Sequence, residues 1–98
     1  MTAHAEILIV RGGLDVESRR AFVASAIDAF GRAAGINAGP VDLDCSRVES
    51  LDEMTLGMLV MVARAAQRRG ARVALVHAST RLRTDLDGAG ASHFFEWR

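Results

Sequence analysis

The sequence has little cysteine, no net charge and no long apolar run. Its one cysteine, Cys45, cannot form an internal disulfide, and no apolar stretch approaches the ~20 residues that a membrane-spanning helix needs. Residues 1–6 contain no basic region followed by an apolar run, as a secretion signal would. The 12 basic and 12 acidic side chains cancel, which removes the electrostatic signature of most nucleic-acid binders. We therefore expect a cytoplasmic protein with no direct membrane insertion and no nucleic-acid partner.

Lysine is absent, and all 12 cationic side chains are arginines. A response-regulator receiver is also a small βα domain with acidic residues near its strand ends, and here Asp42 and Asp44 would supply them. That chemistry uses a lysine beside the metal and the phosphoryl group. The missing lysine makes the receiver a minor alternative.

The hydrophobic pattern alternates between strand and helix. Residues 7–10 form a β-branched apolar run, typical of a central strand covered on both faces, whereas residues 41–45 alternate apolar and acidic, typical of a strand with one side toward the core. The other expected elements are a helix from Asp15 to Gly35, a helix from Asp52 to Gly70, a strand over residues 72–77, a short helix capped by Ser79 or Thr80, and a tail over residues 92–98 that forms an edge strand or a short helix. This order predicts one α/β domain with a largely parallel sheet.

In a parallel sheet, binding and catalytic sites form beyond the carboxyl ends of the strands. Three segments fall there: residues 12–15, 46–52 and 77–80. Ser46, Asp52, His77 and Ser79 carry the groups of a nucleophile, a base and an orienting acid, but the sequence has no G-x-S-x-G elbow. We interpret these side chains as loop polar groups and expect no catalytic residue.

Neither a metal site nor a cofactor site is indicated. Cys45, His4, His77 and His93 lack the paired spacing of a zinc site. The pair Gly12-Gly13 is isolated and no G-K-[ST] follows it, so the sequence has neither a P-loop nor a dinucleotide-binding fingerprint. We expect no metal and no cofactor.

The helix that begins at Asp52 is the most informative segment. Either Ser50 and Glu53 form a capping box, or Asp52 caps the helix alone. The free amides of that first turn favour anions, and a negative charge added there would change any docked interface. An ordinary helix cap explains the same pattern equally well.

Four arginines follow at the other end of this helix, at positions 64, 68, 69 and 72. They could form a patch for an acidic partner. Arginines near a helix C-terminus also stabilise the helix dipole, and we favour that structural interpretation.

Taken in order, these segments resemble the STAS domains, a family named after sulfate transporters and anti-sigma factor antagonists. Residues 10–15 look like the family's strand ending in G-x-L-D, residues 41–50 like its V-x-D-L-S-x-V segment, and residues 51–57 align without a gap on its D-S-S-G-L-G turn. Residues 65–76 and 82–94 look like its last two units. The resemblance implies an α/β fold with a mixed, mostly parallel sheet of about four strands, helices packed mainly on one face, and no catalytic activity.

The sigma-regulating members of this family bind an ATP-dependent anti-sigma kinase at that turn and free the sigma factor, and phosphorylation of a Ser or Thr there breaks the complex. The resemblance therefore implies an anti-sigma factor antagonist. Its partner-binding residues would be Asp15, Ser46, Asp52, Glu53, Met54, Thr55 and Leu56, within a surface that runs to Gly57. The alternative is a STAS subunit of a larger assembly, such as a lipid-transport ABC complex.

The turn departs from the family pattern at the residues that carry the switch. The phosphoacceptor falls on Met54 and the preceding Ser on Glu53, while Asp52 is retained. Methionine cannot accept phosphate, so the switch is either lost or moved to Thr55, which is displaced by about 100° around the helix. From the resemblance we also expect residues 1–98 to form one STAS-like domain that is shortened at both ends relative to the family. An uncovered strand edge would invite a homodimer or another partner.

Overall fold

Strands and helices alternate along the computed structural model, which describes residues 6–33, 39–48 and 52–98. The strands are β1 (Ile7–Ile9), β2 (Val41–Asp44), β3 (Val73–Val76) and β4 (Glu96–Trp97). The helices are α1 (Val16–Ala33), α2 (Glu53–Arg68) and α3 (Thr80–Gly88), and a 3₁₀ turn, η1 (Ser92–Phe94), precedes β4. The strands lie in the order β1-β2-β3-β4 and all their pairings are parallel. The predicted α/β class is confirmed, and the antiparallel strand of a mixed sheet is not among the residues that the structure describes.

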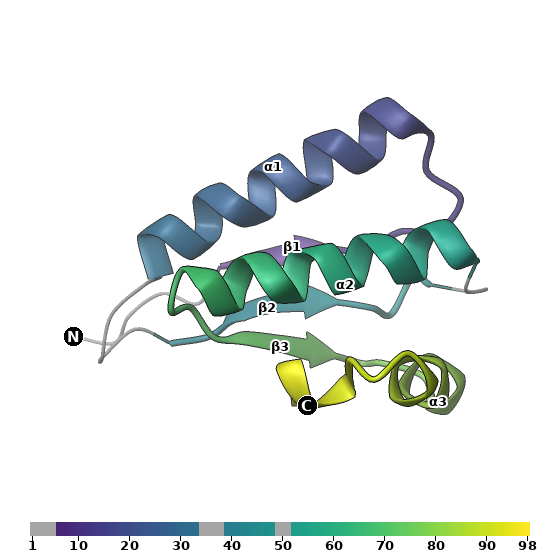
Figure 1. Cartoon of the computed structure of the whole chain (residues 1–98). Helices are drawn as coiled ribbons and strands as arrows, with labels where there is room; N and C mark the ends of the chain where they lie inside the picture. The colour runs from purple at the N-terminus through teal and green to yellow at the C-terminus, as the bar shows by residue number, and fades with distance from the viewer. Residues whose placement is uncertain (1–5, 34–38, 49–51) are drawn as a thin grey trace.

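Helices α1 and α2 run side by side over one face of the sheet (Figure 1). The strand order follows the chain order, and parallel crossovers are almost always right-handed, so successive connections return on the same side of the sheet. The expected packing of helices mainly on one face is thereby explained. Among the described residues, no helix combines the length and apolar character needed to cross a membrane.

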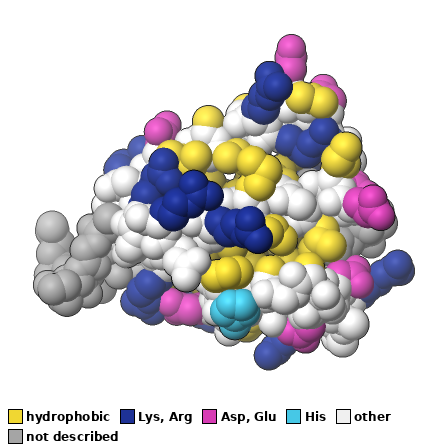
Figure 2. All heavy atoms as spheres, in the orientation of Figure 1, with side chains coloured by type: hydrophobic (Ala, Val, Ile, Leu, Met, Phe, Trp, Pro, Cys, Tyr) yellow, Lys and Arg dark blue, Asp and Glu magenta, His cyan; other side chains and the backbone are white. Residues whose placement is uncertain are grey.

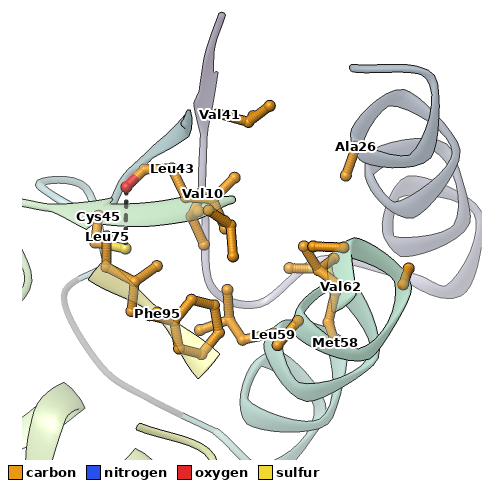
Figure 3. Close-up of a cluster of buried hydrophobic side chains, with 14 of the residues drawn as sticks. Val10, Ala26, Val41, Leu43, Cys45, Met58, Leu59, Val62, Leu75 and Phe95 are labelled. Carbon is orange, nitrogen blue, oxygen red and sulfur yellow. Dashed lines mark hydrogen bonds between the residues drawn. The ribbon is translucent and has the colours of Figure 1, made fainter. Parts of the chain in front are cut away.

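The hydrophobic core lies between α2, α1 and the covered face of the sheet (Figure 3). Val41 and Leu43 of β2 are fully buried and alternate with half-buried acidic residues, as the sequence pattern predicted. Leu59 and Val62 of α2 are equally buried in the same cluster. Burial against apolar groups is the main favourable contribution to folding, so this cluster sets the position of α2 over the strands.

Cys45 belongs to this core and not to a reactive site. Its Sγ donates a hydrogen bond of 3.6 Å to the carbonyl oxygen of Leu43 (Figure 3). Burial raises the pKa of the Cys45 thiol to about 12, with a smaller contribution from the neighbouring Asp44 carboxylate. The thiol therefore stays protonated at neutral pH, and it lacks the thiolate that nucleophilic or metal chemistry needs.

The first strand differs from its prediction. The apolar run predicted a central strand, but in the described residues β1 pairs with β2 alone and lies at the edge of the sheet. Ile7 is 65% exposed and Ile9 is 43% exposed, whereas Leu8 between them packs against the core. Only one face of the sheet carries α1 and α2, so alternate residues of β1 have no second layer to cover them.

The remaining boundaries follow the predicted caps. Gly70 ends α2 with a φ of 67°, in the left-handed region that favours glycine. The Ser79 hydroxyl accepts a hydrogen bond of 3.0 Å from the Leu82 amide and caps α3. The tail forms both expected structures, η1 and β4, and the Trp97 Nε1 donates a hydrogen bond of 3.0 Å to the Ser92 carbonyl. The expected end of the first helix, Gly35, lies outside the described residues.

Candidate functional site

Asp52 connects two segments that are distant in the sequence. Its Oδ1 accepts a hydrogen bond of 2.6 Å from the Thr55 amide, which makes it the N-cap of α2. Its Oδ2 accepts a hydrogen bond of 3.2 Å from the amide of Gly13, in the loop after β1. Asp52 thus has the capping role that was one of the two alternatives from the sequence. The Ser50 of the alternative capping box lies outside the described residues.

The same hydrogen bonds keep the Asp52 carboxylate charged. Donation from the amide and hydroxyl of Thr55 lowers the pKa of Asp52 most, and the Gly13 amide and the positive charge of Arg19 lower it further. The side chain is exposed, so this charge faces solvent at the edge of the sheet. An anionic carboxylate at the N-terminus of a helix is stabilised by the helix dipole.

The loop between β1 and α1 is held by local contacts of its own. Gly13 has a φ of 69°, a conformation in which a side chain would be strained. Asp15 caps α1, since its Oδ1 accepts a hydrogen bond of 2.7 Å from the Ser18 amide, and these contacts with Ser18 lower the pKa of Asp15. The Arg19 Nη1 donates a hydrogen bond of 2.5 Å to the Leu14 carbonyl. Two capped helices therefore start beside each other, joined through Asp52.

The four residues after Asp52 point in different directions. Glu53 and Met54 are exposed, and Met54 is 61% exposed. Leu56 is half-buried against the core. Thr55 is only 2% exposed, so a protein kinase can reach its hydroxyl only if the first turn of α2 opens. The position that resembles the family's phosphoacceptor is thus on the surface, and the neighbouring hydroxyl is not.

Ser46 and His77 lie in loops at the same edge of the sheet, but their polar groups are used locally. The Ser46 amide donates a hydrogen bond of 2.9 Å to Asp44 Oδ1. His77 has a φ of 59°, and its amide donates a hydrogen bond of 3.1 Å to the Arg98 carbonyl. Within the described ranges, no hydrogen bond joins Ser46, His77 or Ser79 to Asp52. The nucleophile, base and acid considered from the sequence are therefore not connected into a catalytic set.

The acidic residues considered for a receiver also have local partners. Asp42 forms an ion pair with Arg98, across β3. The Ser46 amide, followed by the Ser46 hydroxyl, lowers the pKa of Asp44. Among the residues that the structure describes, no group of three or more His, Cys, Asp or Glu side chains could hold a metal ion, and His4 lies outside them.

A groove beside the Asp52 turn was not predicted from the sequence. It has a volume of about 360 Å³ and is lined by Arg19, Glu53, Met54, Gly57, Met58 and Met61. We call it the methionine groove. Figure 2 shows hydrophobic side chains gathered on this face over α1 and α2, with arginine side chains beside them. The available signal was the spacing of Met54, Met58 and Met61, which places them near one another on a helix.

Comparisons with known proteins agree with the fold. A family model described as "Mlab, STAS domain" matches residues 1–96. Among solved structures, the chain is similar to the protein TM1081, known from an NMR structure, with a TM-score of 0.70 and 23% sequence identity. The match covers 94% of this chain and 71% of that chain, and it supports the fold alone at this level of identity. No curated protein matches the sequence.

Proposed function

The chain belongs to the STAS domain family, and from that premise we propose that it is a cytoplasmic, non-catalytic regulator that binds another protein. In this proposal it is an anti-sigma factor antagonist that docks a kinase-type anti-sigma factor through residues 52–57. STAS domains in general are protein-binding domains without catalytic activity, so the family supports the class of function. The choice of partner is our own inference.

The observation that carries the proposal is the double hydrogen bonding of Asp52. Its carboxylate links the loop at Gly13 to the first turn of α2, so the exposed residues Glu53 and Met54 follow a side chain that is hydrogen-bonded to both segments. A surface that is ordered before binding loses less entropy when a partner docks. Asp15 caps the adjacent helix on the same edge and would lie at the margin of the contact.

The regulation of this surface should differ from that of the phosphorylated family members. Met54 is exposed where those members carry a hydroxyl, and Glu53 adds a fixed negative charge beside it. Thr55 is the only hydroxyl residue in the turn of residues 52–57, and its burial opposes modification in the folded state. We therefore propose a constitutive docking surface, with Thr55 as a phosphoacceptor only if the turn opens.

Binding to purified anti-sigma kinases tests this function. We expect a complex with the wild-type chain, and we expect its loss in a double variant, Asp52→Ala with Met54→Glu, because the support and the apolar contact are both removed. Asp87→Ala at the exposed end of α3 is the matched control and should bind normally. Undisturbed binding of the double variant would remove residues 52–57 from the interface.

A second candidate keeps the surface and changes the setting. A STAS subunit of a larger assembly, such as a lipid-transport ABC complex, would hold its partner permanently. The exposed Met54 supports this candidate as strongly as it supports an anti-sigma factor antagonist, since a permanent interface needs no phosphorylation switch. The tagged chain can be purified from its native cell together with its partners. Co-purification of a transporter ATPase, and not of an anti-sigma kinase, would support this second candidate.

A further inference from the structure

Gly57 lies inside α2 at a position where the described part of the fold does not require glycine. Glycine is among the poorest helix formers, because it loses the most backbone freedom on folding. A Cβ at position 57 would meet no atom within 4 Å, and the backbone there is not in the left-handed region. The described part of the chain therefore gives no packing reason for glycine. A bare stretch of helix backbone faces the methionine groove.

Two exposed methionines flank this bare stretch. Met54 and Met61 are seven residues apart, which returns to the same face of a helix, and Met61 is 59% exposed. Met58 lies almost fully buried in the lining between them. Methionine side chains are flexible and polarizable and adapt to the shape of an apolar ligand. The groove thus offers an adaptable apolar surface around a point where another backbone can approach closely.

Two arginines extend the same stripe toward the end of α2. Arg64 and Arg68 are exposed and follow Met61 at the three- and seven-residue spacings that share its face. Among the described residues, the arginines in ion pairs are Arg32, Arg72 and Arg98, so these two positive charges have no carboxylate partner there.

The other two arginines of this region are used by the fold. Arg72 pairs with Glu96, and Arg69 Nη1 donates a hydrogen bond of 3.4 Å to the Ala65 carbonyl near the end of α2. The original cluster of four therefore separates into two arginines with partners in the fold, Arg69 and Arg72, and two exposed ones, Arg64 and Arg68, which lie outside the lining of the groove on the same helix face. At the opposite end of the groove, Arg19 and Glu53 carry opposite charges.

We propose that the methionine groove binds an amphipathic helix of a partner protein, with apolar side chains on Met54, Gly57 and Met61 and carboxylates against Arg64 and Arg68. From residue 54 to residue 68 the stripe is ~21 Å long at 1.5 Å per residue, or about four helical turns. A helix presents apolar anchors at three- and four-residue spacing along that length. The inference rests on the proposed docking function and specifies the chemistry of the partner.

A synthetic helical peptide provides the probe. It carries Leu at helical positions i, i+3 and i+7 and three Glu residues at one end, and a matched peptide carries Lys in place of Glu. In NMR titrations we expect the Glu peptide to shift the Gly57 amide and the Met54 and Met61 methyl signals, with about tenfold weaker binding of the Lys peptide. The double variant Arg64→Glu with Arg68→Glu should reverse that preference.

Gly57→Ala separates a binding role from a structural role. Alanine is the better helix former, so we expect the melting temperature to rise by about 5 °C while peptide binding weakens about tenfold, because the added methyl group blocks the close approach. Gly31→Ala in α1 is the matched control, since a Cβ at position 31 also meets no atom within 4 Å. It should stabilise the protein without changing binding.

Other occupants of the groove give different results. Binding to vesicles of anionic phospholipid with no response to either peptide would identify a lipid surface, and a concentration-dependent dimer with shifts at Met54 and Met61 would identify a second copy of the chain. Each of these two results overturns the proposal. Equal binding of the two peptides, or no NMR shift at millimolar peptide, also overturns it. An anti-sigma kinase that binds the Gly57→Ala variant normally would overturn it while leaving the proposed function intact. If the groove bound the Glu peptide but the protein bound no anti-sigma kinase, the proposed function would be wrong and the inference about the groove would stand.

Discussion

The carboxylate of Asp52 accepts a hydrogen bond from the amide of Gly13, a residue 39 positions earlier in the chain. This contact joins the loops that follow β1 and β2 at the carboxyl edge of the sheet. Because Asp52 also caps α2, one side chain contacts both the start of the helix and the neighbouring loop. The proposed docking role depends on this hydrogen-bonded edge of the sheet.

Removing the Asp52 carboxylate should loosen both segments. We expect Asp52→Ala to lower the melting temperature by roughly 5 °C, because a helix cap is lost, and to speed hydrogen exchange of the Gly13 amide. Asp52→Asn should recover most of the stability, since asparagine is an equally good N-cap. Calorimetry and amide exchange measure the two effects. Unchanged Gly13 exchange in Asp52→Ala would show that the contact does not order the loop.

The lowered pKa values of Asp15, Asp44 and Asp52 predict how stability depends on pH. Each folded-state pKa lies below its unfolded value near 4, so each carboxylate stabilises the fold above that value and loses the effect as the pH falls through the folded-state pKa. We expect these groups to leave the melting temperature flat between pH 6 and 8 and to make it fall below about pH 4.

The Asp52→Asn variant checks this assignment. Its melting temperature should fall less steeply in acid than that of the wild type, because one of the titrating carboxylates is gone. An identical acid limb in both proteins would mean that Asp52 contributes nothing to the pH dependence.

Local features of this fold could be predicted from the sequence, whereas the sheet order could not. The cap at Asp52 and the left-handed Gly70 depend on residues within one or two helical turns. The edge position of β1 depends on which strands flank it and on which face the helices cover, and a run of apolar residues specifies neither. The prediction of a central strand was wrong because it inferred the position of β1 in the sheet from its apolar residues alone, and Ile7 and Ile9 are exposed.

The candidate site also combines a feature that the sequence could predict with one that it could not. Helical spacing places Thr55 on the face of Leu59 and Val62, a signal of burial that could have been used. From the sequence we considered Thr55 only as a phosphoacceptor and partner-binding residue, and the structure shows it to be 2% exposed. The methionine groove required the position of α1, because Arg19 forms part of its lining. Only the packed structure brings that side chain beside Met54.

Restoring a hydroxyl at position 54 should restore a modification site. We expect a cognate anti-sigma kinase to phosphorylate the variant Met54→Ser, whose hydroxyl would be exposed, and to leave the wild type unmodified because Thr55 is buried. Intact-mass spectrometry after incubation with ATP distinguishes the two. The variant Met54→Ser with Thr55→Val controls for the neighbouring hydroxyl and should be modified equally. Phosphate on Thr55 of the wild type would mean that the turn opens and that the switch has moved by one residue.

The most direct test of the docking account is the affinity of a purified anti-sigma kinase for the variant Met54→Glu, measured by isothermal titration calorimetry. The matched control is Ile7→Glu, which places the same charge on an exposed apolar position of β1, remote in sequence from the turn. We predict that Met54→Glu weakens binding by at least about 2 kcal/mol, or roughly thirtyfold, while Ile7→Glu binds like the wild type. Equal affinities of the wild type and Met54→Glu would contradict the central claim that the surface at Asp52 is where this protein binds its partner.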